Sequence, residues 1–148
     1  MAKEIERKFL VKDLSFIPLA IESRFIKQGY LAINKNLEIR VSIRDNNICK
    51  LCIKSNNNAL IRDEFEYDIP IKDAVELLNK CERKLFKTRY IVHHEYKLWE
   101  VDVLHLPDRD LIIAEIELNS PAETILIPDF IGEEVTENPD YYNKNIAY

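Results

Sequence analysis

The feature that most constrains this chain is an alternation of apolar and charged residues that recurs along most of its length. Successive side chains of a β-strand point to opposite faces, so each such run predicts a strand with one apolar and one ionic face. In "LEIRVSIR", Ile39, Val41 and Ile43 share one face, and the residues between them share the other. The alternation predicts eight strands, over residues 3–11, 21–33, 37–44, 48–55, 61–69, 85–94, 97–104 and 111–118.

The links between these strands predict antiparallel pairing. The tracts "RDNN", "KSNNNA" and "HHEY" are typical of tight turns and short loops. Such short links connect antiparallel neighbours, whereas parallel strands need a long crossover. We therefore expect a mainly β chain, with residues 1–148 forming one domain.

Helices are expected to be few. Residues 72–84, "KDAVELLNKCERK", place Ala74, Leu78 and Cys81 on one helical face. "SPAE" from Ser120 has the form of a capping box with proline at the first helical position. Asn138-Pro139 is a second predicted helix start, and a short turn is expected near residues 13–19.

Composition and charge exclude several classes of function. The chain has 148 residues and a formal net charge of -5, which argues against general binding to nucleic acid or to anionic membranes. It contains no apolar run of roughly 20 residues and no signal peptide, so a cytoplasmic location is expected. Its 2 glycines are too few for a glycine-rich phosphate loop. Cys49 and Cys52 form a lone CxxC on a predicted strand, which does not indicate a zinc or redox site.

The charges on the ionic faces are sorted by sign from strand to strand. Neighbouring inward positions are acidic on some strands (Glu4 and Glu6, Glu100 and Asp102, Glu115 and Glu117) and basic on others (Lys50 and Lys54, Lys87 and Arg89). Like charges this close repel, so the clusters are unfavourable unless an opposite charge lies between them. Acid pairs suit a hard divalent cation, and basic pairs suit phosphate oxygens. A sheet whose ionic face is merely solvated is the structural alternative.

The residues also resemble a known family. "EIERKF" near the start has the ExExK pattern of the CYTH superfamily, also called triphosphate tunnel metalloenzymes. Further similar segments follow in family order: "KQGYL" (27–31), "EIRV" (38–41), "IKS" (53–55), "IRDEFEYDI" (61–69), "KTRY" (87–90), "EVDV" (100–103), "AEIEL" (114–118), "GEEVTE" (132–137) and "YYNKNIA" (141–147). The resemblance covers essentially the whole chain and is strongest to short bacterial inorganic triphosphatases.

This resemblance implies an eight-stranded antiparallel β-barrel with a few flanking helices and a charged tunnel that binds a triphosphate with Mg²⁺ or Mn²⁺. It assigns metal binding to Glu4, Glu6 and Glu117, assisted by Glu115 and Asp102 directly or through water. It assigns phosphate binding to Lys8, Arg40, Lys54, Arg62, Lys87 and Arg89. Tyr30 and Glu64 are expected to line the tunnel, Lys8 and Lys87 to assist catalysis, and Lys144 to lie in a segment that closes one mouth.

One position departs from the family pattern. The third strand of the family often reads Glu-x-Arg-x-Arg; here Glu38 and Arg40 fit, but Ser42 stands at the second arginine. Arg44 is on the same face, about 6–7 Å further along the strand. The loss of a close guanidinium predicts weaker binding of one phosphate; the alternative is that Arg44 or Lys50 reaches the substrate instead.

The resemblance predicts hydrolysis of a small-molecule triphosphate, most simply inorganic triphosphate. A thiamine triphosphatase, a class IV-type adenylyl cyclase, a non-catalytic sensor of polyphosphate or nucleotide, and a structural barrel remain alternatives. No nucleic-acid or membrane partner is expected. The outward apolar face predicts either a monomer or a homodimer.

Overall fold

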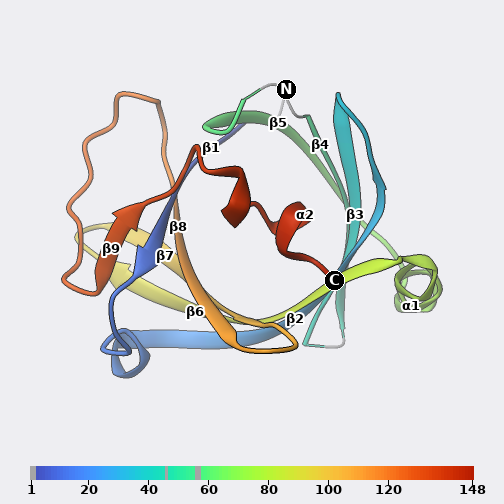
Figure 1. Ribbon diagram of the computed structural model, residues 1–148, viewed down its shortest axis with the longest axis horizontal. Helices are drawn as coiled ribbons and strands as arrows, with labels where there is room; N and C mark the ends of the chain where they lie inside the picture. Colours follow the sequence, from blue (N-terminus) through green and yellow to red (C-terminus); the bar gives the residue numbers. More distant parts are fainter. Residues whose placement is uncertain (1–2, 46, 56–57) are drawn as a thin grey trace.

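The predicted strands pair into a closed antiparallel ring, into which Figure 1 looks. The computed structural model describes residues 3–45, 47–55 and 58–148. Its strands are β1 (Lys3–Val11), β2 (Ala20–Ile33), β3 (Leu37–Arg44), β4 (Ile48–Ser55), β5 (Ile61–Asp68), β6 (Arg83–His94), β7 (Lys97–His105), β8 (Asp110–Glu117) and β9 (Ile131–Glu134). Their order is β5-β4-β3-β2-β6-β7-β8-β1-β9, and a further pairing of β5 with β1 closes the first eight into a barrel. The expected fold is confirmed.

Strand β1 closes the barrel because it has three partners. Residues 6–10 pair with residues 113–117 of β8, while residues 3–5 pair with residues 61–63 of β5. Further along β1, Phe9 and Val11 pair with β9. The short strand β9 was not predicted, since four residues are too few for a clear alternation.

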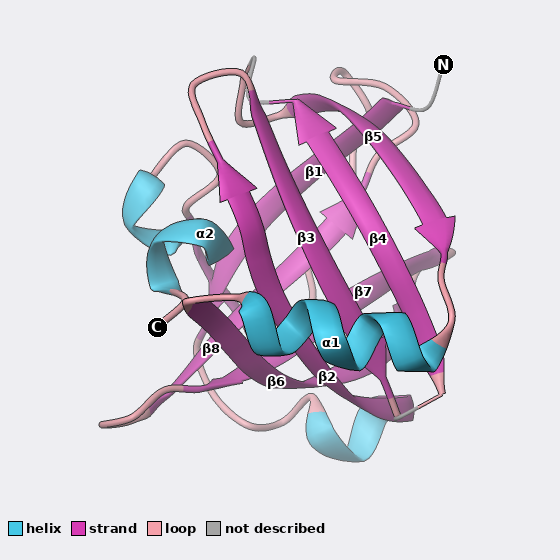
Figure 2. Cartoon of the chain, turned by 90° about the vertical axis from the view of Figure 1, so that its right-hand side faces the viewer, coloured by secondary structure: helices cyan, strands magenta, loops and turns pink. Residues whose placement is uncertain are grey.

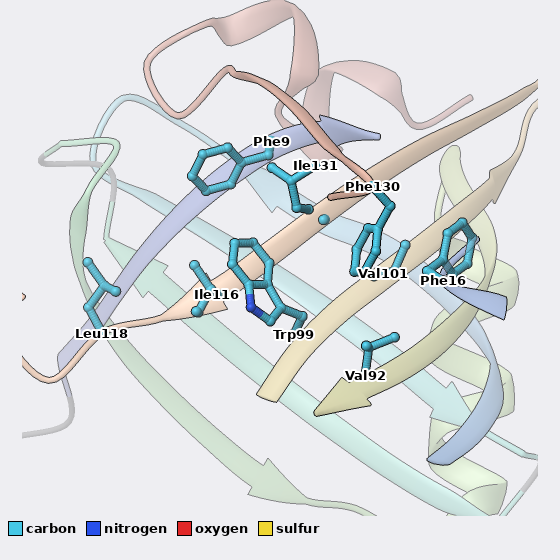
Figure 3. Close-up of a cluster of buried hydrophobic side chains, with 10 residues drawn as sticks. Phe9, Phe16, Val92, Trp99, Val101, Ile116, Leu118, Phe130 and Ile131 are labelled. Carbon is cyan, nitrogen blue, oxygen red and sulfur yellow. The ribbon is translucent and has the colours of Figure 1, made fainter. Parts of the chain in front are cut away.

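The apolar outer face of the barrel carries most of the core. Trp99, Val101 and Ile116 of β7 and β8 pack with Phe9 of β1 and with Phe130, which lies just before β9 (Figure 3). In Figure 2, helix α1 (Ile71–Lys80) lies across the opposite side, over β2, β3 and β4. With the apolar side chains outside, the ionic faces of the strands are left to line the interior.

Helix α1 packs closely on the barrel at a glycine. A Cβ atom at Gly29 of β2 would lie 2.7 Å from Cys81 Sγ and 2.9 Å from Leu78 Cδ1, so a side chain there would collide with the end of the helix. The helix ends at Lys80, earlier than predicted, and the chain turns extended at Cys81. The residues from Arg83 onward join β6 instead, because pairing with β2 outweighs their helical propensity.

The other predicted helices have mixed outcomes. The helix expected from Ser120 is wrong: residues 119–122 form a bend and a turn. The β-branched stretch that follows, together with Pro128, disfavours continuing a helix. The start at Asn138 is confirmed, because its side chain accepts a hydrogen bond from Asp140 N. The chain continues from it into η2 (Pro139–Tyr141) and α2 (Asn143–Ile146). The expected early turn is η1 (Ile17–Leu19).

None of the helices in the described part of the chain is long and apolar enough to cross a bilayer.

Candidate active site

The interior of the barrel contains a cavity of about 440 Å³. Its lining, among the described residues, includes eight acidic and eight basic side chains. The acidic ones are Glu4, Glu6, Glu38, Glu64, Glu66, Glu100, Glu115 and Glu117. The basic ones are Lys8, Arg40, Arg44, Lys54, Arg62, Lys87, Arg89 and Lys144. Every residue predicted from the sequence as a metal or substrate ligand lines this cavity except Asp102, and Tyr30 lines it too.

Asp102 is not part of the lining and is 1% exposed. Its Oδ1 accepts a hydrogen bond from Arg89 Nε (2.8 Å), and its Oδ2 accepts one from Arg89 Nη2 (2.9 Å) and is 3.0 Å from Lys87 Nζ. Both oxygens are therefore already engaged by cations. In this arrangement Asp102 is ion-paired with Lys87 and Arg89, and a metal ion at Asp102 would compete with these two cations.

Two buried carboxyl groups on β1 and β8 share a hydrogen bond. Burial and the negative charge of Glu115 raise the pKa of Glu6 well above its usual value. Burial opposes the charge on Glu115 too, but the Lys8 ammonium and the hydrogen bond with Glu6 hold its pKa well below the usual value. Glu6 also lies directly opposite Glu117 in the β1–β8 ladder. A cluster of buried carboxyl groups that disfavour each other's negative charge, built only of hard oxygen donors, fits Mg²⁺ or Mn²⁺.

A second acidic group has its neutralising cations already. Among the described residues, the ligand atoms of Cys52, Glu64 and Glu66 lie within 4.8 Å of one another. Glu64 is 3.2 Å from Lys54 Nζ, and Glu66 is 3.4 Å from Arg44 Nη2. Burial raises the pKa of the Cys52 thiol, so it stays protonated at neutral pH. This group is therefore a poorer cation site than the carboxylates around Glu6.

Lys87 is the most deeply buried cation of the cavity, with a side chain that is 2% exposed. Burial lowers its pKa to about 8, against the opposing effect of Asp102. Lys87 lies opposite Ile26 in the β2–β6 ladder, and Ile26 lies opposite Arg44 in the β2–β3 ladder. A lysine with a pKa near neutrality can exchange a proton during a reaction.

Two arginines present unused donors. Arg62 Nη2 donates to Glu38 Oε1 (2.7 Å), and Arg44 Nη2 donates to Glu66 Oε2 (3.4 Å). The Nε atom of each is buried and has no hydrogen-bond partner among the described residues. A guanidinium with a buried and unpaired Nε donor fits an anionic ligand, because unmade hydrogen bonds of charged groups are costly.

The structure distinguishes the two candidates to compensate for Ser42. Arg44 lines the cavity, whereas Lys50 is not part of the lining and pairs with Asp68. Ser42 itself is buried on β3 between Gln28 and Lys50. The guanidinium that reaches the cavity from this strand beyond Arg40 therefore belongs to Arg44.

The C-terminal segment lies across the opening of the barrel, where Figure 1 shows α2 in front of the ring of strands. Lys8 Nζ donates to Tyr141 O (3.1 Å), and Lys144 Nζ is 4.0 Å from Glu38 Oε2. Tyr148 and Lys84 exchange backbone hydrogen bonds of 2.8 and 2.6 Å, which fix the end of the segment to β6. Tyr142, Asn143 and Lys144 accordingly line the cavity.

Sequence reasoning left out several residues of the lining. Parity already places Glu38, Glu66 and Glu100 on the ionic faces of their strands, but the resemblance assigned them no ligand role. Thr136, Tyr142 and Asn143 follow no strand pattern and reach the cavity only through the path of the C-terminal segment. The sequence carries no periodic signal for them.

A model of the CYTH domain matches residues 2–146 of the chain. The chain belongs to the CYTH family. A protein from Acetivibrio thermocellus, named inorganic triphosphatase, is 38% identical over 149 residues, covering 99% of this chain and 94% of that protein. An inorganic triphosphatase from Nitrosomonas europaea is 32% identical, covering 97% of this chain and 96% of that protein.

Solved structures agree with this membership. The crystal structure of an inorganic triphosphatase superposes with a TM-score of 0.70 at 31% identity, covering 99% of this chain and 95% of that one. A putative adenylyl cyclase from Hippeastrum, described as having a dominant triphosphatase activity, superposes with a TM-score of 0.64 at 16% identity over 80% of both chains. At that identity the second likeness concerns the fold alone.

Proposed function

We propose that this CYTH protein hydrolyses the terminal phosphoanhydride bond of a triphosphate, with inorganic triphosphate as the principal substrate and Mg²⁺ or Mn²⁺ as the cofactor. The observation that carries the proposal is the matched set of eight acidic and eight basic side chains in one cavity. A bare polyphosphate would suit an excess of cations, whereas a metal–triphosphate complex needs both carboxylates and cations. The inorganic triphosphatases that the chain resembles support the choice of substrate.

Each charged group then has a role. Glu4, Glu6 and Glu117, with Glu115 beside them, would hold the metal, whereas Lys8, Arg40, Arg44, Lys54, Arg62 and Arg89 would hold phosphate oxygens. The bound cation would neutralise phosphate charge and acidify a water molecule. Lys87 Nζ, with a pKa of about 8, would accept a proton from the attacking water. Lys8 Nζ would stabilise charge on the leaving diphosphate.

The test is phosphate release from purified protein supplied with inorganic triphosphate, thiamine triphosphate, ATP or long-chain polyphosphate, each with Mg²⁺ or Mn²⁺. The expected result is fastest release from inorganic triphosphate, and no release once the metal is chelated. Faster turnover of thiamine triphosphate would make that compound, and not inorganic triphosphate, the principal substrate. Formation of cyclic AMP from ATP without phosphate release from triphosphate would contradict hydrolysis.

The cell compartment and assembly state are proposed as well. All three cysteines are buried free thiols, which supports the cytoplasmic location proposed from the sequence. Of the two predicted states, monomer and homodimer, the exposed apolar side chains on the outer face of the barrel, such as Phe65 (41%) and Tyr67 (54%), favour the homodimer. Light scattering of the purified protein distinguishes the two states.

A further inference from the structure

Lys54 is bound by three carboxylate oxygens in the cavity. Its Nζ lies 3.1 Å from Glu4 Oε1, 3.0 Å from Glu4 Oε2 and 3.2 Å from Glu64 Oε2. An ammonium group has three N–H donors, and three carboxylate oxygens surround it here, two by hydrogen bonds and one as an ion pair. The side chains of Lys54 and Glu4 are only 8% and 14% exposed, so water screens the contact weakly.

The sheet holds this trio in place. Lys54 lies directly opposite Glu64 in the β4–β5 ladder, and Glu4 lies opposite Arg62 in the β1–β5 ladder. All three side chains therefore project from neighbouring strands at the seam that closes the barrel. Their contact follows from strand register rather than from the path of a loop.

The contact conflicts with the roles that the proposed function gives to two of its members. Glu4 is proposed to bind the divalent cation, yet both of its oxygens are engaged by Lys54. Lys54 is proposed to bind phosphate, yet three carboxylate oxygens already surround its ammonium group. Two cations placed on one carboxylate repel each other, so Glu4 binds the metal less tightly while it keeps Lys54.

We propose that Lys54 is an internal counterion that occupies Glu4 in the metal-free protein and is released to phosphate only when metal and triphosphate bind together. The proposal rests on the function proposed above and adds to it how the binding of metal and the binding of triphosphate are coupled. Glu4 exchanges an ammonium for the divalent cation. Lys54 keeps Glu64 as its anchor on the protein and directs the donors it withdraws from Glu4 to a phosphate oxygen.

The exchange makes the binding of metal and triphosphate synergistic. A metal ion that arrives alone must take Glu4 from Lys54 and leaves that ammonium short of acceptors, whereas triphosphate supplies new ones. By linkage, triphosphate must raise metal affinity by the same factor by which metal raises triphosphate affinity. The substrate of the cavity is then the metal–triphosphate complex, and free metal binds weakly.

The test measures Mn²⁺ binding directly, from the electron paramagnetic resonance signal of free Mn²⁺, with and without the hydrolysis-resistant analogue imidotriphosphate. In the wild-type protein we expect imidotriphosphate to tighten Mn²⁺ binding by on the order of 10-fold or more. In Lys54→Met, Mn²⁺ alone should bind about 10-fold more tightly, and most of the synergy should disappear. Lys54→Arg keeps the positive charge and should keep Mn²⁺ binding weak.

Lys144→Met is the matched control, because it removes the same charge from the same cavity but from a lysine that lies near Glu38 rather than Glu4. It should change Mn²⁺ affinity by less than about 3-fold. Equal tightening in both methionine variants, or no tightening in Lys54→Met, overturns the exchange. No Mn²⁺ binding to the wild type, even with imidotriphosphate, overturns the metal site itself and the proposed function with it. Thermal unfolding of each variant verifies that it is folded.

Discussion

Replacing Asp102 with asparagine separates two roles for a residue that sequence reasoning assigned to metal. The carboxylate makes three charge-assisted contacts, of 2.8 and 2.9 Å with Arg89 and 3.0 Å with Lys87, and the side chains of Asp102 and Lys87 are both 2% exposed. Removing one partner of a buried ion pair costs roughly 3–5 kcal/mol. We therefore expect Asp102→Asn to lower the free energy of unfolding by about that amount, provided the variant folds.

The same substitution should change how activity depends on pH. Asp102 opposes the lowering of the Lys87 pKa by burial, so its loss should move that pKa further below about 8. Denaturant unfolding at pH 7 and the pH dependence of kcat/KM measure the two effects. A loss of stability below about 1 kcal/mol, combined with a loss of Mn²⁺ affinity, would refute the positioning role and favour metal binding.

Three further changes have defined outcomes. If neutral Lys87 is the base, kcat/KM should rise about tenfold per pH unit below pH 8 and level off above it. Lys87→Arg should lower activity by roughly 100-fold or more. A value of kcat/KM that falls as the pH rises through 8 would contradict this role. Gly29→Ala should destabilise the protein by about 1–3 kcal/mol in thermal or denaturant unfolding, because its Cβ collides with the end of α1; unchanged stability would show that the helix can shift. Arg44→Ser should raise the KM for triphosphate by on the order of 10-fold, and adding Ser42→Arg should restore it; failure of rescue would mean that the positions are not equivalent.

The barrel was predictable from the sequence because the information is local. Period-two alternation fixes which side chains share a face, and the bounds 3–11, 37–44 and 48–55 coincide with β1, β3 and β4. The sorting of charge by strand placed acids and bases in one interior. Alternation could not show which strand closes the ring, because this depends on β1 pairing with both β5 and β8.

The contacts inside the cavity were not predictable. Parity places Glu4, Lys54 and Asp102 on inward faces, but it cannot show that Lys54 binds Glu4 or that Asp102 turns to Lys87 and Arg89. These pairings depend on strand register and on side-chain length across several strands. The helix predicted from Ser120 was wrong for a local reason. The capping signal is present in the sequence, but the residues that follow it do not continue a helix.

In the proposed mechanism, triphosphate hydrolysis depends on a metal ion held by the carboxylates of β1 and β8. The most direct measurement is phosphate release from inorganic triphosphate with Mg²⁺ by the wild type, by Glu6→Gln and by Glu76→Gln, whose site is an exposed position on α1. We expect hydrolysis by the wild type and Glu76→Gln, and a loss on the order of 100-fold or more in Glu6→Gln. Undiminished turnover in Glu6→Gln would contradict the account.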